Sequence, residues 1–336
     1  MKVWLTHRMH GMLGACVLGL VGLTSAAQAQ AAPDNAPLDQ AVVVERQALR
    51  LDTTERIAII SAFEPELALL TQALHEPREY RVNGVVFTTG TLQGHPVLLF
   101  LSGISMVNAA MNTQLALDRF KLSHVLFSGI AGGVNPDLNI GDVSVPERWA
   151  QHLEVLMARE IVPGSYEQPP SKETITLPNF GMLHHRAVRT ASEAQAEPHP
   201  QLWFPVDPDL LALARNIQDV ELQSCDEDRV CLREAPRLVV GGVGLSGSAF
   251  VDNAQYREHL SEVFKANVVD MESAACAMVA QANQVPFLAF RSVSDLAGGG
   301  PDANEMPIFL NIAAENSARV LMAFLKQWPK QAPESR

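Results

Sequence analysis

The sequence predicts an α/β fold, a single domain with a central mixed, mostly parallel twisted sheet flanked by helices. Apolar runs of strand length alternate with amphipathic runs of helix length from residue 53 to about residue 330. No internal repeat is visible. Of the 336 residues, 47% are apolar, which is enough to cover both faces of one large sheet.

The predicted elements follow in order along this range. The strands are RIAIISAF at 56–63, two runs around a glycine turn at 85–103, HVLFSGIAGG at 124–133 running into a glycine turn, DVSVPERW at 142–149, PRLVV at 236–240, NVV at 267–269 and PFLAFRSVSD at 286–295. The helices are 107–115, NAQYREHLSEVF at 253–264, the run after NVV to residue 282, and the closing 309–328.

The first 29 residues read as a signal peptide. Lys2 and Arg8 precede the apolar run at 12–23, and AQA at 27–29 fits a small-residue cleavage site. A transmembrane anchor is the alternative, but the apolar run is too short to span a bilayer. We expect a mature chain that starts near Gln30, is periplasmic or secreted, and has no membrane contact after cleavage.

Three further segments interrupt the strand and helix pattern. Residues 30–52 are rich in Ala, Pro, Asp and Gln and are predicted to be a flexible lead-in, and 331–336 form a polar tail. Residues 158–205 are rich in Pro, His, Glu and Ser without a sustained period, which predicts a long loop excursion that could serve as a lid. The catalytic domain is therefore expected at 53–330.

Charge and cysteine content narrow the classes of partner. The formal net charge is −12 and no Lys/Arg run exists, which argues against nucleic acid or an anionic membrane as a partner. Cys225 and Cys231 lie close together in CDEDRVC, where export would favour a disulfide over two free thiols. The cysteine spacing suits no zinc site, and no metal or other cofactor is implied.

Acidic residues gather where three predicted strands end. Glu66 follows the first strand, Asp270 and Glu272 follow NVV, and Ser294 and Asp295 end the last strand. A single acid at such a place is usually a helix cap. Because ligands of open α/β sheets bind beyond the carboxyl ends of the strands, three such ends predict a shared pocket.

Carboxylates in one pocket suit the cleavage of a bond that develops positive charge. A glycosidic bond does so through a transition state that resembles an oxocarbenium ion. If the leaving group is a nucleobase, an acid must protonate a ring nitrogen, and a buried carboxyl with a raised pKa can do so.

Six segments, in this order, carry a resemblance to a known family: IAIISAFEPE, SGISMVNAA, SGIAGGVNPDLNIGDVSVP, GLSGSAFVDN, VVDMESAACA and FRSVSDLAGG. The chain resembles the nucleoside phosphorylase and nucleosidase superfamily over 56–328. It looks closest to methylthioadenosine/S-adenosylhomocysteine nucleosidases and to plant bark storage proteins. The resemblance implies a nucleoside phosphorylase-like fold, a small-molecule purine nucleoside as ligand, and a homo-oligomer.

The resemblance also implies catalytic roles. Glu66 matches the glutamate that activates the attacking water. Asp295 matches the aspartate that protonates purine N7, with Ser294 beside it. Arg291 matches an arginine near that aspartate and is expected to orient it. The repulsion of nearby carboxylates is expected to keep Asp295 protonated.

Substrate contacts follow from the same resemblance. Glu272 matches the glutamate that holds the ribose hydroxyls, and Met271 packs against the ribose. Phe250 and Val251 match positions that contact the base. Ile130 stands where the nucleosidases commonly have Ser or Thr, so that a hydroxyl is missing from the pocket floor.

Water is favoured over phosphate as the nucleophile. Phe127 stands where phosphorylases have an arginine, and SAFEPE replaces their first glycine-rich phosphate turn. The sequence therefore predicts an exported N-glycosyl hydrolase acting on adenosine-type purine nucleosides. The alternatives are a purine nucleoside phosphorylase with an unorthodox phosphate site and a non-catalytic nucleoside-binding or storage protein.

Overall fold

The computed structural model describes residues 50–169, 177–192, 194–300 and 302–329. The predicted signal peptide at 1–29, nearly all of the lead-in at 30–52 and the tail at 331–336 lie outside these residues. The first strand begins at Asp52, the last residue of the predicted lead-in.

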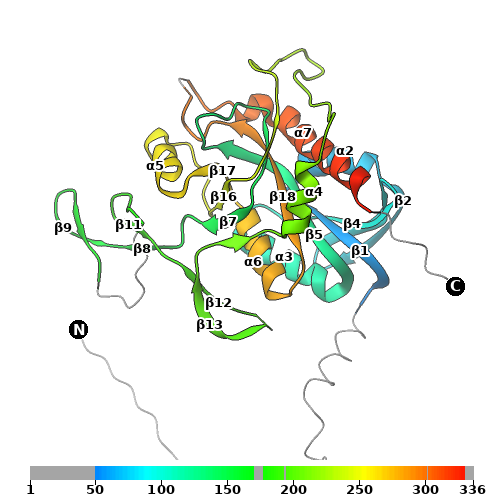
Figure 1. Cartoon of the computed structure of the whole chain (residues 1–336), viewed down its shortest axis with the longest axis horizontal. Helices are drawn as coiled ribbons and strands as arrows, with labels where there is room; N and C mark the ends of the chain where they lie inside the picture. The colour runs from blue at the N-terminus through cyan, green and yellow to red at the C-terminus, as the bar shows by residue number, and fades with distance from the viewer. Residues whose placement is uncertain (1–49, 170–176, 193, 301, 330–336) are drawn as a thin grey trace, which may run out of the picture. The chain divides into compact units, whose positions relative to one another are not determined.

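A twelve-stranded sheet forms the centre of the described chain (Figure 1). Its main path runs β14-β7-β16-β17-β5-β1-β4-β3-β2, and β18, β6 and β15 extend it from β5. Six of the eleven strand pairings are parallel and five are antiparallel. The predicted fold class is confirmed. The strands are β1 (Asp52–Ser61), β2 (His75–Val82), β3 (Val85–Leu92), β4 (His95–Leu101), β5 (Phe120–Gly133), β6 (Val143–Val145), β7 (Arg148–Gln151), β14 (Phe204–Pro205), β15 (Leu238–Val240), β16 (Val243–Ser246), β17 (Ala266–Asp270) and β18 (Phe287–Asp295).

Six helices accompany the sheet in the described residues. They are α2 (Glu64–Gln72), α3 (Met106–Arg119), α4 (Pro208–Arg215), α5 (Ala254–Phe264), α6 (Ser273–Ala282) and α7 (Met306–Gln327). Helices α2, α7 and α3 pack on β5, and α6 packs against α3 and on β7, β16 and β18 (Figure 1). Helix α7 is long and apolar enough to cross a membrane, but 61% of its most apolar window is buried inside the protein, as in a core helix.

The strands β1, β5 and β18 are buried because they are covered by these helices. Their central residues are almost all apolar and inaccessible, such as Ile59, Phe127 and Phe290. Parallel pairing of β1 and β18 with β5 brings the ends of three strands to one edge. Glu66 follows β1 and Asp295 ends β18, while Asp270 and Glu272 come from the end of β17, which pairs antiparallel with the end of β5.

Strand β5 corrects the prediction for 124–133. The glycines after Ser128 do not form a turn, because β5 continues to Gly133. At Gly129 an added Cβ would lie 2.5 Å from both the Glu66 carboxylate and the Arg291 guanidinium. Glycine is needed there so that two charged side chains can approach the strand backbone.

Several elements escaped the sequence prediction. Strand β2 has the sequence HEPREYRV and is mostly exposed, so it lacks an apolar run, and it lies at the end of the sheet path. The short helices α2 and α4 begin with Glu-Pro and Pro-Asp, which suit a first helical turn. The segments 142–149 and 236–250 each hold two short strands instead of one.

The stretch 158–205 is not the irregular loop that was expected. Its described residues form short hairpin strands: β9 (Arg159–Val162) pairs with β10 (Ser165–Glu167), β11 (Leu183–His185) pairs with β8 (Val155–Met157), and β12 (Val188–Ser192) pairs with β13 (Gln195–Gln201). Polar, mostly exposed strands carry little apolar signal, which is why the sequence did not reveal them.

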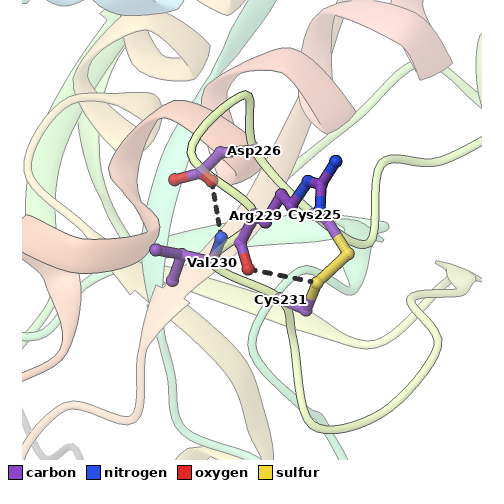
Figure 2. The surroundings of a disulfide bond; sticks show 5 residues. All are labelled: Cys225, Asp226, Arg229, Val230 and Cys231. Atoms are coloured by element: carbon purple, nitrogen blue, oxygen red, sulfur yellow. Dashed lines mark hydrogen bonds between the residues drawn. A yellow bond between two sulfur atoms is a disulfide. The ribbon is translucent and has the colours of Figure 1, made fainter.

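Cys225 and Cys231 are joined by a disulfide, with their Cα atoms 4.0 Å apart (Figure 2). Within the ring, the carboxylate of Asp226 accepts a 2.7 Å hydrogen bond from the Val230 N–H. The loop therefore closes on itself through one covalent bond and one charged hydrogen bond. Cys276 is a free, buried thiol in α6.

Candidate active site

A cavity opens at the edge where β1, β5, β17 and β18 end. Its volume is about 780 Å³ including the open mouth. Most of the lining is apolar. The predicted residues on its wall are Glu66, Ile130, Phe250, Val251, Met271, Glu272, Ser294 and Asp295. Among the predicted site residues, only Arg291 does not line it.

Glu66 lies in the first turn of α2 and is 1% exposed. Its Oε2 accepts a 2.6 Å hydrogen bond from the Ala62 N–H, and its Oε1 accepts a 2.8 Å bond from the Ile130 N–H. The bond to Ala62 reaches back across the helix start, as a glutamate in the third helical position often does. Glu66 therefore serves as a helix cap and also presents a carboxylate to the cavity.

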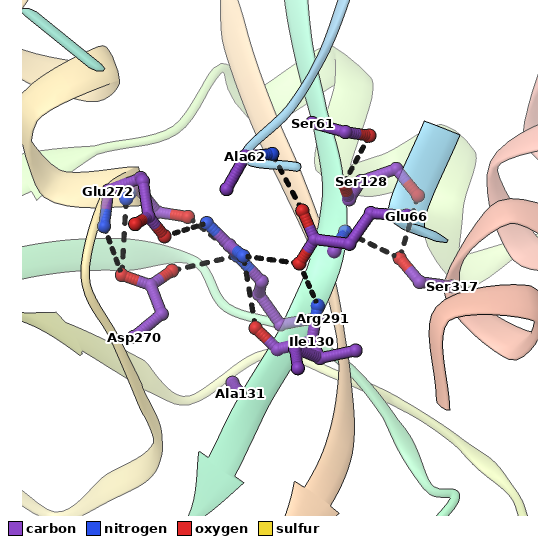
Figure 3. Close-up of polar contacts among 12 residues, drawn as sticks. Ser61, Ala62, Glu66, Ser128, Ile130, Ala131, Asp270, Glu272, Arg291 and Ser317 are labelled. Atoms are coloured by element: carbon purple, nitrogen blue, oxygen red, sulfur yellow. Dashed lines mark hydrogen bonds and ion pairs between the residues drawn. The ribbon is translucent and has the colours of Figure 1, made fainter. Parts of the chain in front are cut away.

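Arg291 lies below the cavity and contacts three carboxylates (Figure 3). Its nitrogens lie 3.7 Å from Glu66, 2.7 Å from Asp270 and 3.3 Å from Glu272, and all four side chains are almost fully buried. The Arg291 Nη1 also donates a 3.0 Å hydrogen bond to the Ile130 carbonyl. Burial alone would lower the pKa of Arg291, but the three carboxylates raise it above its usual value, so the guanidinium stays charged.

Arg291 is held in place from its other sides. Its Nε donates to the Ser273 hydroxyl at 3.0 Å, so the short approach to Asp270 is an ion pair without hydrogen-bond geometry. The guanidinium stacks over the Phe127 ring at 4.1 Å. Phe127, which stands where the resemblance places an arginine in the phosphorylases, is thus the ring on which Arg291 stacks.

Glu272 begins α6 and joins two parts of the cavity wall. Its Oε1 accepts a 2.7 Å hydrogen bond from the Ser105 N–H, and its Oε2 faces Arg291. Ser105 has a φ of 82°, a strained value for a residue with a side chain. Burial raises the pKa of Glu272 to about 7; Arg291 opposes this shift and the neighbouring Asp270 adds to it.

Asp270 ends β17 and supports the start of α6. Its Oδ1 accepts hydrogen bonds from the N–H groups of Glu272 and Ser273, at 3.0 and 3.1 Å, and from the Ser246 hydroxyl. Its Oδ2 faces Arg291. These contacts fit the supporting role that was expected for Asp270.

Asp295 lies in a different environment at the end of β18. Its Oδ1 accepts hydrogen bonds from the Ala297 N–H at 2.8 Å and from the Asn304 side-chain amide at 3.2 Å. Its Oδ2 accepts a 2.9 Å bond from the Ser294 hydroxyl. Burial raises the pKa of Asp295, and the charge of Asp252 adds to this effect, while the three hydrogen bonds lower it.

Two predictions about Asp295 are therefore wrong. Arg291 does not orient Asp295, because its ion pairs are with Glu66, Asp270 and Glu272. Glu66, Asp270 and Glu272 are not the carboxylates that repel the ionised form of Asp295, because Arg291 neutralises part of their charge. The negative charge that raises the pKa of Asp295 is that of Asp252.

Apolar side chains make up the rest of the wall. Val251 is buried, whereas Phe250 is 53% exposed and Ile104 is 50% exposed at the mouth. Ile130 acts on the cluster through its backbone, since its N–H donates to Glu66 and its carbonyl accepts from Arg291. The side-chain hydroxyl that Ile130 lacks is not needed for either contact.

Sequence reasoning missed Ser105, Asp252 and Asn304. Ser105 contributes through its backbone and a positive φ, which no sequence motif reveals. Asn304 follows a Gly/Pro-rich run after β18 that carries no periodic pattern. Only its place nine residues after Asp295, just before α7, hints that it could turn back toward that carboxylate.

Comparison with known proteins agrees with this geometry. The family model described as "Phosphorylase superfamily" matches residues 56–326. The chain belongs to this superfamily. The predicted superfamily is thus confirmed, while the likeness to bark storage proteins stays a prediction.

Relatives with known names are nucleosidases. The chain is 30% identical over 276 residues to a 5′-methylthioadenosine/S-adenosylhomocysteine nucleosidase of Tolumonas auensis, covering 81% of this chain and 99% of that protein. The nucleosidase of S. pneumoniae with a transition-state inhibitor is 27% identical, with a TM-score of 0.58 over 82% of this chain and 100% of that one. The nucleosidase of Colwellia psychrerythraea 34H in complex with adenine is 25% identical, with a TM-score of 0.61 over 84% and 99%.

Proposed function

We propose that this protein is an N-glycosyl hydrolase that splits adenosine-type purine nucleosides into base and ribose sugar. The observation that carries the proposal is the pairing of two different carboxyl environments in one cavity. Glu66 is held by N–H donors near Arg291, whereas Asp295 is buried and pairs with no cation among the described residues. The nucleosidase relatives, one of them with bound adenine, support the same reaction class.

Glu66 is the general base. Burial raises the pKa of Glu66 above its usual value, and the Arg291 charge and the N–H groups of Ile130 and Ala62 oppose part of this shift by stabilising the ionised form. An ionised carboxylate on the cavity wall can take a proton from water as the water oxygen bonds to the anomeric carbon. General base help of this kind contributes ~10²–10⁴-fold.

Asp295 is the general acid. As the bond between sugar and base breaks, the electron pair moves into the purine, and Asp295 donates its proton to the ring nitrogen N7. The water proton ends on Glu66, so atoms and charges balance. The raised pKa of Asp295, caused first by burial, keeps the proton in place before the reaction.

Glu272 and Met271 hold the sugar. A carboxylate oxygen accepts hydrogen bonds from a ribose diol, and the Met271 side chain on the same wall provides an apolar surface. Phe250 and Val251 contact the base from the loop after β16. The mostly apolar wall strengthens the polar contacts inside the cavity, because it excludes water.

Phosphate is disfavoured as the nucleophile. A phosphate dianion needs free cations and N–H donors. Arg291 is already paired with three carboxylates and does not line the cavity. The N–H groups of Ala62 and Ile130 are bound to Glu66. The nearby negative charges would repel a dianion.

The test is an assay of mature protein with adenosine, inosine and methylthioadenosine, with and without phosphate. We expect base release that does not depend on phosphate, with free ribose sugar as the second product. Base release only with phosphate, accompanied by a sugar phosphate, would identify a phosphorylase. Tight binding of a nucleoside with no release of base would identify a binding or storage protein.

Export is part of the proposal. It is supported by the signal-like first 29 residues and by the Cys225–Cys231 disulfide, which an oxidising compartment would preserve. A periplasmic or secreted enzyme of this kind would scavenge nucleosides. Expression from the native start, cell fractionation and mass spectrometry of the amino terminus should find a mature chain beginning near Gln30; uncleaved protein in the cytoplasm would contradict export.

A homo-oligomer is also proposed. Ile104 precedes α3 and lines the cavity, and Val107 and Met111 lie in the first two turns of α3; 50%, 75% and 58% of their surface is exposed. The spacing of four residues places Val107 and Met111 on one helix face. Sedimentation analysis should show an oligomer that Val107→Glu dissociates, with Lys121→Glu as a control at another exposed site. A monomeric wild type would exclude the assembly.

A further inference from the structure

We propose that Asn304 and Asp252 are positioning residues for the acid of this reaction. Together they hold Asp295 so that its transferable proton lies on Oδ2, on the side of Ser294. The inference rests on the proposed function and adds to it a three-residue chain, Asp295–Asn304–Asp252.

The hydrogen bonds of Asp295 decide which oxygen carries the proton. Its Oδ1 accepts from the Ala297 N–H at 2.8 Å and from Asn304 Nδ2 at 3.2 Å. Two donors occupy both acceptor directions of that oxygen, so a proton on Oδ1 would collide with one of them. The proton of the neutral acid is left with Oδ2.

Oδ2 can release its proton without breaking the hydrogen bonds that Oδ1 accepts. Its partner among the described residues is the Ser294 hydroxyl, 2.9 Å away. The same hydroxyl lies 3.4 Å from the Ala131 carbonyl and can donate there instead. Ser294 can therefore turn toward Ala131 when Oδ2 is protonated and toward Oδ2 when the proton has left.

Asn304 joins two carboxylates through one amide nitrogen. Its Nδ2 donates to Asp252 at 3.0 Å and to Asp295 at 3.2 Å, one hydrogen to each. Its Oδ1 accepts from the Met306 N–H at 2.9 Å, which fixes the amide at the start of α7. The orientation of the amide is thus determined at all three of its contacts.

Asp252 brings the base-contacting loop into this chain. It follows Val251, and the next residue, Asn253, donates its N–H to the Ala297 carbonyl at 3.1 Å. The loop after β16 and the loop after β18 are therefore joined twice, by backbone and by Asn304. A base that contacts Phe250 and Val251 lies on the same loop that positions the acid.

The charges around Asp295 come from several elements. Asp252 is the nearest through Asn304, and Arg257 of α5 donates to the Gly133 carbonyl behind the site. Glu305 at the start of α7 pairs with Arg233. Glu66 and Glu272 lie on the cavity wall but share Arg291. Among the described residues, Asp252 is the carboxylate that reaches Asp295 most directly, through Asn304.

Asp252 and Asn304 shift the pKa of Asp295 in opposite directions. The negative charge of Asp252 raises the pKa of Asp295, whereas the hydrogen bond from Asn304 lowers it. Loss of the Asp252 charge should weaken proton retention. Loss of the Asn304 donor should strengthen retention and also loosen the carboxyl group.

The experiment compares pH profiles of kcat/KM for base release in Asp252→Asn, Asn304→Asp and wild type. Asp252→Asn should move the alkaline limb to lower pH, because Asp295 loses its proton earlier. Asn304→Asp keeps an acceptor for the Met306 N–H, so the fold is retained. It should move the alkaline limb to higher pH and lower the maximal rate by roughly tenfold or more, because the acid is no longer aligned.

Asp302→Asn is the matched control. It removes one exposed acid from the same loop without touching the chain of hydrogen bonds, so its profile should coincide with that of wild type. Affinity for adenine should be measured across the same pH range, because it does not depend on turnover. The pH at which this affinity falls should shift in each variant in the same direction as the alkaline limb of kcat/KM.

Two failures can be told apart. If wild type releases base and the limbs of Asp252→Asn and Asn304→Asp stay at the wild-type pH, this inference is wrong and the proposed function stands. If wild type releases no base from any purine nucleoside, the proposed function is wrong. Alkaline limbs that move in the same direction in both variants would also overturn the inference. A general loss of structure would shift both limbs alike, whereas the proposed roles of Asp252 and Asn304 shift them in opposite directions.

Discussion

The two acidic parts of the cavity differ in how they compensate burial. Glu66, Asp270 and Glu272 share the Arg291 guanidinium, and each also accepts backbone N–H donors. Asp295 accepts one backbone N–H, one hydroxyl and one amide, but no cation pairs with it in the described part of the chain. All four carboxyl groups are nearly inaccessible to solvent.

The difference shows how one cavity can hold a base and an acid. Burial penalises the ionised form of every carboxyl group. The Arg291 guanidinium offsets part of that penalty for Glu66, Asp270 and Glu272, which favours carboxylates that can accept a proton. Asp295 contacts only neutral donors in the described residues. The pKa values of Glu66, Glu272 and Asp295 are all raised by burial, so the contrast lies in their contacts and not in the direction of the pKa shift.

The largest effect should come from the base. Glu66→Gln keeps an acceptor for N–H donors but cannot take a proton from water, so kcat should fall by about 10²–10⁴-fold. Stopped-flow or steady-state assays of base release would measure it, with nucleoside affinity as a check that binding is retained. Activity close to wild type would remove the role of Glu66.

Asp295→Asn is the matched change at the acid. Its rate should fall for purine nucleosides but be largely retained for a riboside with a phenolic leaving group of low pKa, which needs no protonation. Glu66→Gln should be slow on both substrates. Equal losses for Asp295→Asn on both substrates would contradict the division between acid and base.

The next effect concerns stability at the cation. Arg291→Met leaves three buried carboxylates without their counter-charge, so the free energy of unfolding should fall by about 3–5 kcal/mol. Urea unfolding at neutral pH would measure it. The control is Arg186→Met, which breaks a half-exposed pair with Glu154 and should cost less than about 1 kcal/mol. Similar losses in both variants would show that the buried cluster has no special need for its cation.

A smaller effect is expected in the pH dependence of stability. The pKa of Glu272 is raised from 4.5 to about 7, mainly by burial, so the folded state binds its proton more tightly than the unfolded state. The stability linked to this proton is complete below about pH 4.5 and is lost as pH rises through about 7.

Glu272→Gln removes this titration. Between pH 5 and 7 the wild type should lose on the order of 2–3 kcal/mol more stability than the variant. Thermal unfolding across that range would show the difference, with Glu315→Gln on the exposed side of α7 as a control. Parallel curves for wild type and Glu272→Gln would contradict the shifted pKa.

The smallest effect should come from Ile130. Its backbone makes the contacts to Glu66 and Arg291, so Ile130→Ser should change kcat/KM by no more than roughly fivefold, the value of one ordinary hydrogen bond. The nucleoside assay would measure it. A rate increase of a hundredfold would show instead that the missing hydroxyl limits this protein.

The sequence predicted much of the site because strand ends are visible in it. Glu66 and Glu272 follow apolar strands and Asp295 ends one. The sheet brings these strand ends together, because β1 and β18 pair with β5 in parallel and β17 pairs with the end of β5 in the antiparallel sense. The fold class and the superfamily were predicted for the same reason and are confirmed. The roles assigned to single residues stay predictions until the variants are measured.

Other features could not be predicted because they depend on distances between segments. Arg291 lies four residues before Asp295, a spacing that places both side chains on the same face of a regular strand. A register shift between Val293 and Asp295 interrupts this alternation, and Arg291 contacts Glu66, Asp270 and Glu272 instead of Asp295. The hairpins of 158–205 were missed because they bury little apolar surface.

The sequence by itself determined the α/β pattern, the superfamily and the set of acids at the strand ends, since these follow from periodicity and local order. Only the tertiary structure decided which contacts each of these acids makes. Glu66, Asp270 and Glu272 share Arg291, whereas Asp295 contacts Asn304. A pKa responds to neighbours within a few ångströms, however far apart they are along the chain.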